Sequence, residues 1–315
     1  MVWFLLACSK PSVAPLPEPE PVVVPEPPPP PPEPVIEPLP TEGAFRREVA
    51  PGLVVAAYDP PDIPDLGYSR APTSELEGTD RRIFVVTIDP AHYGFRYLSV
   101  LDDSVTPGHK TAAEWAEVND LHVAFNPGMF EPGYEPTGYT RSGSFVPQPM
   151  VRQHKLYRGW FVAGETVSVV DQVPPKASSG NYSRFDQVPD EVRGRFDAAD
   201  VVSQSLPIVL GGKAAYPPRT KHWSELAYGA DAEGRVVVVF SRYPYEMREF
   251  GARVVALELG IDGLIHGEGG PEATLVVKAG GVELLNVGSY ETGFYDDRNE
   301  RPWMLPAVIG AVPKG

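Results

Sequence analysis

Apolar residues along the chain gather in short runs that are typical of strands. Arg82–Asp89 (RIFVVTID) is a β-branched run bounded by Pro90, and Phe95–Leu101 (FRYLSVL) follows as the strand expected to pair with it. Leu121–Phe125 (LHVAF) is expected to be a third strand, which leads into a loop that begins at Asn126. The pattern in this part of the chain therefore indicates a sheet.

A hairpin is expected near residue 230. Glu225–Ala230 and Arg235–Phe240 are apolar runs that flank the turn Asp231–Gly234. Along the chain, strands neither alternate regularly with helices nor all form hairpins, and no internal repeat is visible. The pattern therefore predicts an α+β fold: a single strand-rich, mixed-sheet domain with a few flanking helices.

Two short helices are expected from local signals. Thr111–Glu114 has the capping-box pattern, which opens a helix through Trp115 to Val118. A second set of apolar residues recurs at helical spacing before Gly260, which is placed to stop that helix. Its members are Met247, Phe250, Val254 and Leu257.

The N-terminal segment differs in composition from the rest of the 315-residue chain. Between Pro11 and Pro40 about half of the residues are proline, with glutamates interspersed. Such a segment lacks backbone donors and has too little apolar side chain to offset the entropy cost of ordering. We therefore expect residues 9–44 to be a disordered Pro/Glu-rich tether and residues 45–315 to form the folded domain.

The first eight residues, MVWFLLAC, join an apolar run to the chain's only cysteine, Cys8. They resemble the lipobox of bacterial lipoproteins, in which this cysteine becomes the lipid-modified N-terminus. The run has no basic region before it and is shorter than the about 7–15 residues of a signal core, so an undirected apolar N-terminus is the alternative. The lipobox interpretation predicts a lipidated Cys8, a membrane anchor and an exported location in the bacterial cell envelope, on its periplasmic or surface side.

The formal net charge of −15 narrows the partners. Affinity for a phosphate backbone comes from Lys and Arg, so nucleic acid is not expected as a partner. No run of about 18 apolar residues occurs, and a conventional transmembrane helix is therefore not expected. The sequence leaves the oligomeric state open.

The segment from residue 266 to residue 277, HGEGGPEATLVV, carries the strongest sign of chemistry. It places Glu268 and Glu272 around a Gly-Gly-Pro turn, and glycines let backbone N–H groups approach a ligand closely. A dinucleotide-binding loop would need a helix after the glycines, whereas Ala273–Val277 is expected to be a strand. The segment indicates either a small-ligand site or a solvated surface turn.

The order of motifs resembles the phosphodiester glycosidase family over roughly residues 80–313. The strongest match sets the family's Asp-Gly-Gly-Gly-Ser-x-Thr-Leu against Glu268–Leu275, and the family's Asn-Gly-Gly-x-Phe against Asn126–Phe130. Ser205–Lys213 and Pro306–Val312 match two further family segments. The resemblance implies the family's fold and a glycosidase-type hydrolase.

Three features depart from the family pattern. Glu268 stands in place of Asp, Glu272 replaces a small polar residue, and Gly288–Asp297 adds acids. The fold should carry over, whereas the substrate need not. These departures leave a non-catalytic, glycan-binding envelope lipoprotein as the alternative function.

If the resemblance holds, the enzyme cleaves a sugar-1-phosphodiester or a related glycan linkage. Glu268 would stabilise the oxocarbenium-like centre or activate water, with Glu272 as its partner. Further residues are expected to bind the substrate's sugar or phosphate. They are Asn126, Gly128, Gly269, Gly270, Thr274 and Arg242.

No cofactor is expected, but a divalent cation such as Ca²⁺ stays open as an alternative because it prefers oxygen ligands. The acids that could hold it are Glu268, Glu272, Glu291, Asp296 and Asp297. His266 is expected to be a hydrogen-bonded structural residue, with a catalytic base as the alternative. Trp115 and Trp223 are expected to lie in the core.

Overall fold

The structure is a computed structural model that describes residues 38–64, 76–105, 107–176, 180–291 and 297–315. Cys8 and most of the proline-rich segment lie outside the described residues. Residues 38–44, which the composition assigns to the tether, contact the domain: the Arg82 guanidinium donates to the carbonyls of Pro40, Thr41 and Gly43. Leu39 also packs against the core. The folded unit therefore begins before Phe45.

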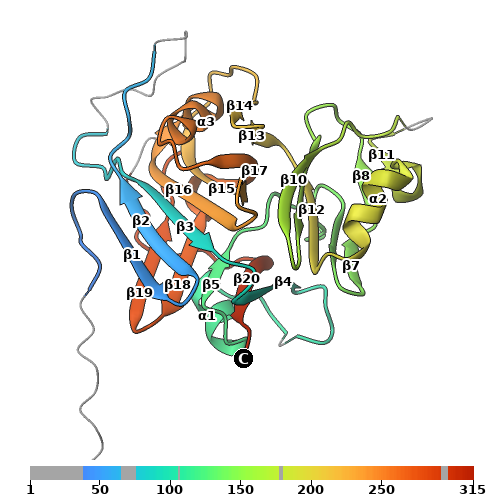
Figure 1. The fold of residues 1–315 in the computed structure, drawn as a ribbon, viewed down its shortest axis with the longest axis horizontal. Helices are drawn as coiled ribbons and strands as arrows, with labels where there is room; N and C mark the ends of the chain where they lie inside the picture. Colours follow the sequence, from blue (N-terminus) through green and yellow to red (C-terminus); the bar gives the residue numbers. More distant parts are fainter. Residues whose placement is uncertain (1–37, 65–75, 106, 177–179, 292–296) are drawn as a thin grey trace, which may run out of the picture. The chain divides into compact units, whose positions relative to one another are not determined.

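The largest sheet has eight strands in the order β1-β2-β3-β16-β15-β17-β13-β14 (Figure 1). Their bounds are β1 Phe45–Ala50, β2 Leu53–Tyr58, β3 Ile83–Ile88, β13 Pro207–Leu210, β14 Lys213–Ala214, β15 Trp223–Asp231, β16 Val236–Tyr245 and β17 Ile261–Gly269. β15 and β16 form the expected hairpin, with Ala230 opposite Val236. The prediction of a hairpin at this place is confirmed.

Two five-stranded sheets and one two-stranded sheet complete the fold. The order β19-β18-β5-β20-β4 joins β4 Tyr93–Ser99, β5 Val123–Phe125, β18 Thr274–Ala279, β19 Val282–Val287 and β20 Ala307–Pro313. The order β10-β9-β12-β6-β7 joins β6 Thr140–Ser142, β7 Phe145–Gln148, β9 Gly159–Ala163, β10 Val167–Asp171 and β12 Val201–Ser205. The pair β11-β8 consists of β8 Met150–Arg152 and β11 Tyr182–Arg184.

The fold is more strongly β than expected. Every pairing between the described strands is antiparallel, so the sheets are not mixed. The helices in the described part are α1 Ala112–Val118, α2 Asp190–Asp197 and α3 Met247–Val255, with the short 3₁₀ helices η2 Phe185–Gln187 and η3 Gly270–Glu272. The prediction of a strand-rich fold is therefore confirmed, and α+β describes this fold only approximately. None of the described helices is long and apolar enough to cross a membrane.

One expected strand pair is wrong. β3 pairs with β2 and β16, whereas β4, the next strand along the chain, pairs with β20 near the C-terminus. The two strands do not share a sheet. They meet instead in the core, where both contribute buried aromatic residues to one apolar cluster. Proximity in sequence favours pairing but does not decide it.

The main core lies between the eight-stranded sheet and the two five-stranded sheets. Its members come from all three and include Val55, Phe84, Tyr228, Phe95, Phe125, Ile309 and Phe161. α3 packs its Phe250 and Val254 against the opposite face of the large sheet, so β16 is buried on both sides. This double burial explains why the sequence of β16 begins with a continuous apolar run instead of an alternating one.

The helices begin and end as local chemistry dictates. Thr111 caps α1 and forms the full capping box with Glu114, as the sequence predicts. α1 then packs Trp115 against the sheet that contains β5 and β18. α3 ends at Val255, and two residues with left-handed backbone follow it, Glu258 (φ 55°) and Gly260 (φ 70°), so Gly260 lies beyond the end of the helix.

Tyr228 links the core to the loop after β5. Its hydroxyl is fully buried, donates to the Pro127 carbonyl at 2.5 Å and lies 3.1 Å from the Ser203 hydroxyl. We expect Tyr228→Phe to lower the free energy of unfolding by about 1–3 kcal/mol, because it leaves a buried carbonyl without its donor. Urea unfolding followed by fluorescence measures this change. The matched control is Tyr134→Phe at an exposed position, expected to shift stability by less than about 0.5 kcal/mol, and equal effects of the two variants would contradict the prediction.

Candidate active site

A pocket of about 420 Å³ opens at the C-terminal end of β17. Its walls come from the loop after β5, the start of β15, the end of β17, η3 and Glu291. The lining residues are Met129, Phe130, Thr137, Trp223, His266, Glu268, Gly269, Gly270, Glu272 and Glu291. The pocket therefore combines carboxylates with apolar and aromatic walls, which is typical of a small-molecule site.

The acidic motif is built differently from the expected loop. His266 to Gly269 continue β17, and the Gly-Pro-Glu that follows forms η3. Ala227 of β15 lies opposite His266, whereas Glu225 lies opposite Gly269, so β17 carries one extra residue in this interval. A bulge of this kind bends the strand locally, and both His266 and Glu268, two residues apart on it, line the pocket.

Glu225 is a fully buried carboxylate behind the pocket. Its Oε1 lies 2.5 Å from His266 Nδ1, and its Oε2 accepts a hydrogen bond from the Trp223 indole N–H. Burial raises the pKa of Glu225, while the adjacent His266 lowers it. Burial alone would lower the pKa of His266, but the Glu225 carboxylate outweighs that effect and raises it. The pair therefore favours a charged imidazolium beside the pocket.

Glu268 has a strongly perturbed carboxyl on the pocket wall. Its side chain is only partly exposed, and the protein atoms around it raise its pKa to about 7. The neighbouring Glu272 and Glu225 act in the same direction, against His266 and the N–H of Gly269. A carboxyl that titrates near neutral pH can both give and take a proton under physiological conditions.

Glu272 and Glu291 flank the same glycine. A Cβ placed on Gly270 would lie 3.6 Å from Glu272 Oε2 and 3.8 Å from Glu291 Cβ. Burial raises the pKa of Glu272, and the charge of Glu291 raises it further. Gly270 has a φ of 69°, a backbone conformation that favours glycine and lets η3 turn away from β17.

Gly269 lets an aromatic ring pack against the strand. A Cβ at this position would lie 2.6 Å from Trp223 Cδ1, so a side chain here would displace the indole. Trp223, expected in the core, is thus held at the pocket wall by Gly269 and by its hydrogen bond to Glu225. Trp115, by contrast, is fully buried in the core.

Asn126, Gly128 and Thr274 lie behind the pocket instead of lining it. The Asn126 side chain is buried and its Oδ1 accepts from the Thr274 N–H at 2.8 Å, which ties β5 to β18. The Thr274 hydroxyl donates to the Glu272 carbonyl at 3.1 Å. Gly128 lines a separate small cavity. The residues that the loop after β5 gives to the pocket lining are Met129, Phe130 and Thr137.

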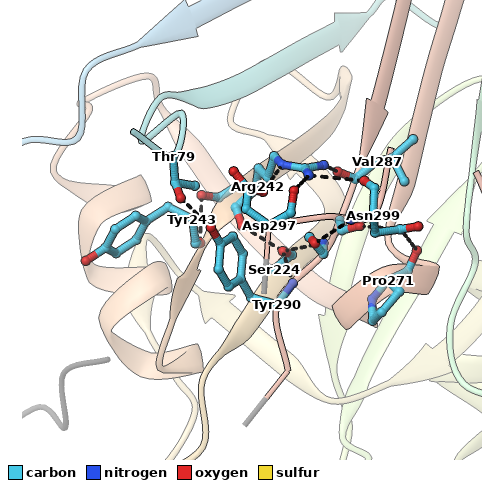
Figure 2. A network of polar contacts seen from close by, with 12 residues as sticks. Thr79, Ser224, Arg242, Tyr243, Pro271, Val287, Tyr290, Asp297 and Asn299 are labelled. Atoms are coloured by element: carbon cyan, nitrogen blue, oxygen red, sulfur yellow. Dashed lines mark hydrogen bonds and ion pairs between the residues drawn. The ribbon is translucent and has the colours of Figure 1, made fainter. Parts of the chain in front are cut away.

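Arg242 also lies away from the pocket lining. Its guanidinium donates to the carbonyls of Val287, Asp297 and Asn299 and to the Asp297 carboxylate (Figure 2). The Asn299 side chain in turn donates to the Gly288 carbonyl at 2.7 Å and to the Pro271 carbonyl at 3.4 Å. Arg242 therefore fastens the chain on either side of Glu291, and through Asn299 that chain also contacts η3.

Ser224 supports the same region from β15. Its hydroxyl donates to the Arg242 carbonyl and accepts from the N–H groups of Ser289 and Tyr290 (Figure 2). The Tyr290 hydroxyl contacts Thr79 in turn. Glu291 thus follows a stretch of backbone that several hydrogen bonds hold in place, although its own side chain is exposed.

Within the described residues, no group of three or more His, Cys, Asp or Glu is arranged to hold a metal ion. Of the acids considered for Ca²⁺, Asp297 instead forms an ion pair with Arg242, and Asp296 lies outside the described part. The donor set does not fit the six to eight oxygens that Ca²⁺ takes.

Sequence reasoning missed Glu225, Met129 and Thr137, and it placed Trp223 in the core. Glu225 carried a usable signal, because a glutamate within the apolar run of β15 must be buried with a partner. Met129 and Thr137 carried none, since their loop position has no periodicity. The structure brings together Glu268, Glu272, Gly269 and Gly270 of the predicted residues, while Cys8 lies outside the described ones.

Comparison with known proteins supports the fold. No family model matches the chain, and no curated protein matches its sequence. A hypothetical protein from Synechocystis has a similar structure (TM-score 0.55, 13% identity), the match covering 87% of this chain and 64% of the other. The catalytic domain of zebrafish N-acetylglucosamine-1-phosphodiester alpha-N-acetylglucosaminidase, auto-inhibited by its pro-peptide, is also similar (TM-score 0.53, 14% identity, 87% of each chain). At these identities the likeness is one of fold, so the chain has a fold distantly related to that of a glycosidase catalytic domain.

Proposed function

We propose that the protein is a hydrolase that cleaves the glycosidic C1–O bond of a sugar-1-phosphodiester or a related glycan linkage. The observation that carries the proposal is the Glu268 carboxyl, with its pKa of about 7, on the wall of a 420 Å³ pocket that also contains Glu272. Glycoside hydrolases usually act through two carboxyl groups whose environments differ. The fold shared with a glycosidase catalytic domain is consistent with this activity.

The environments of the two carboxyls suggest their roles. Glu268, which keeps its proton up to about pH 7, would protonate the leaving oxygen as the C1–O bond breaks. Glu272 would take the proton of the water that adds to C1. The family resemblance implies that Glu268 stabilises the oxocarbenium-like centre or activates water. The proton-donor role differs from both, because a carboxyl that is half protonated near pH 7 is well suited to donate a proton.

The Glu225–His266 pair would hold the rest of the site in place. Glu225 orients the imidazole through Nδ1, and the same carboxylate holds the Trp223 indole. A positive His266 near Glu268 opposes the rise of its pKa, which limits that rise to the useful range. Trp223 and Phe130 would provide apolar walls for a sugar ring. Attachment to the bacterial envelope through a lipid on Cys8 remains a separate proposal.

Removing the Glu268 proton should abolish most of the activity. We expect Glu268→Gln to lower kcat by about 10²–10⁴-fold on glycosides with poor leaving groups, because one general acid contributes on that scale. Glu165→Gln, at an exposed position outside the pocket, is the control. Initial rates on a panel of sugar-1-phosphodiesters and glycosides provide the measurement. Unchanged activity in Glu268→Gln would exclude its proposed role, and binding of glycans without turnover of any would favour the binding lipoprotein instead.

The pH dependence should report the same carboxyl. Because the protonated form of Glu268 is the active one, kcat should fall as pH rises through about 7. The leaving group provides an internal control: a substrate with an activated aryl leaving group should show a weaker fall, since it needs less protonation. Identical pH profiles for both substrates would contradict proton donation by Glu268.

The buried pair can be tested without any substrate. In Glu225→Gln the carboxylate that contributes most to raising the pKa of His266 is gone, so burial should lower that pKa relative to the parent protein, although Glu268 still acts in the opposite direction. Imidazole resonances followed by NMR against pH measure the change. His122, whose pKa burial lowers and which contacts Tyr93, should titrate identically in both proteins. An unaltered His266 titration would show that Glu225 does not control it.

A further inference from the structure

The charge of the pocket is one-sided. Three of its lining residues, Glu268, Glu272 and Glu291, are carboxylic acids, and none of the described lining residues is a lysine or an arginine. Among the described residues, His266 is the cation that lowers the pKa of Glu268. That cation is already compensated, because Glu225 Oε1 lies 2.5 Å from its Nδ1. The pocket therefore offers an incoming ligand more negative charge than positive charge.

The two outer acids, Glu272 and Glu291, line the same pocket and both approach Gly270. Glu272 Oε2 and Glu291 Cβ are both within 4 Å of a Cβ position on Gly270, and the charge of Glu291 raises the pKa of Glu272. Two like charges repel each other, and a cation placed between them replaces this repulsion with attraction. An ammonium group has three N–H donors and suits such a pair.

The walls beside this pair suit a cationic sugar as well. Trp223 borders the pocket, and the face of an indole attracts cations. Phe130 is 38% exposed, so a sugar ring can bury apolar surface against it. An anionic ligand would meet the same aromatic faces without that attraction.

The arginine best placed by sequence to neutralise a phosphate is engaged elsewhere. The Arg242 N–H groups are directed at the oxygens of Val287, Asp297 and Asn299. Releasing this guanidinium for a ligand would break the attachment of the chain beside Glu291. A phosphate in the pocket would face three carboxyls with little compensation, and like-charge contacts of this kind disfavour binding.

We propose that the substrate is an amino sugar whose ammonium group binds between Glu272 and Glu291, a specificity that rests on the proposed glycan hydrolysis at this site. Of the two linkages considered above, the site thus favours the glycosidic bond of a cationic glycan over a sugar phosphodiester. Glu291 and one oxygen of Glu272 bind the ammonium group, the second oxygen of Glu272 takes the proton of the water, and Glu268 protonates the leaving oxygen.

Binding of three sugars that share one ring tests the charge preference. The probes are glucosamine, glucose and glucose 1-phosphate, with the corresponding galactose series, all below the pKa of the sugar amine. The Trp223 indole N–H resonance reports binding at this pocket. We expect the amino sugar to bind at least about tenfold more tightly than the neutral sugar, and the phosphate to bind more weakly than the neutral sugar.

Charge removal provides the matched test. In Glu272→Gln/Glu291→Gln the preference for the amine should fall to within about threefold. Glu165→Gln/Glu191→Gln removes the same charge at exposed positions outside the pocket and should keep the preference. Tighter binding of the phosphate, an unchanged preference in the pocket variant, or no effect of the amino sugars up to about 0.1 M would each overturn the proposal.

The outcome separates this proposal from the hydrolase proposal. Amine preference without turnover of any glycan leaves the specificity standing and removes the enzyme activity. Faster hydrolysis of a sugar phosphodiester than of a matched amino-sugar glycoside has the opposite meaning: the protein is a hydrolase, but its pocket does not select cations.

Discussion

The buried Glu225 carboxylate is the constraint on which the site depends. A carboxylate with no exposure must be paired, and here its two oxygens are satisfied by His266 and Trp223. Those two contacts fix two rings at the pocket wall from inside the largest sheet. Both rings line the pocket beside Glu268. Burial is the main cause of the raised pKa of Glu268, and the imidazole that Glu225 holds in place opposes that rise.

The position of the site follows from the sheet. β15 and β17 are central strands, packed on one face by α3 and on the other by the main core. Because packed layers cover both faces of these strands, their backbone can depart from regular strand pairing only near the strand ends. The extra residue in β17 lies at such an end, next to Glu268, so the sheet provides stiffness while the bulge bends the strand locally.

Sequence patterns predicted those helices, strands and turns that depend on residues close together in the sequence. The capping box at Thr111, the hairpin from β15 to β16 and the strand after Glu272 all depend on residues within a few positions of each other, and all were found. The antiparallel partner of β4 lies more than 200 residues away along the sequence, so nearby pattern could not identify it. Only long-range burial decides such a pairing.

The site was predicted to a similar extent. The motif around Glu268 and Glu272 stood out because glycines and acids were clustered there. Asn126 and Arg242 matched the expected chemistry by type, but their polar groups bind Thr274 and backbone carbonyls instead. Residue type alone cannot reveal whether a donor faces a ligand or another part of the fold, since both arrangements satisfy the same hydrogen-bonding demand.

The hydrogen bonds that Arg242 makes to the backbone around Glu291, here called the Arg242 clamp, have an evolutionary consequence. Three of its partners are main-chain carbonyls, which every residue type supplies. A clamp of this kind holds the backbone beside Glu291 with few demands on the side chains that project from it. Related proteins could therefore exchange the residue at position 291 for a neutral or basic one while keeping the scaffold. Substrate preference in this fold would then drift by single substitutions at the pocket rim, without any change to the sheet that carries the reacting carboxyl.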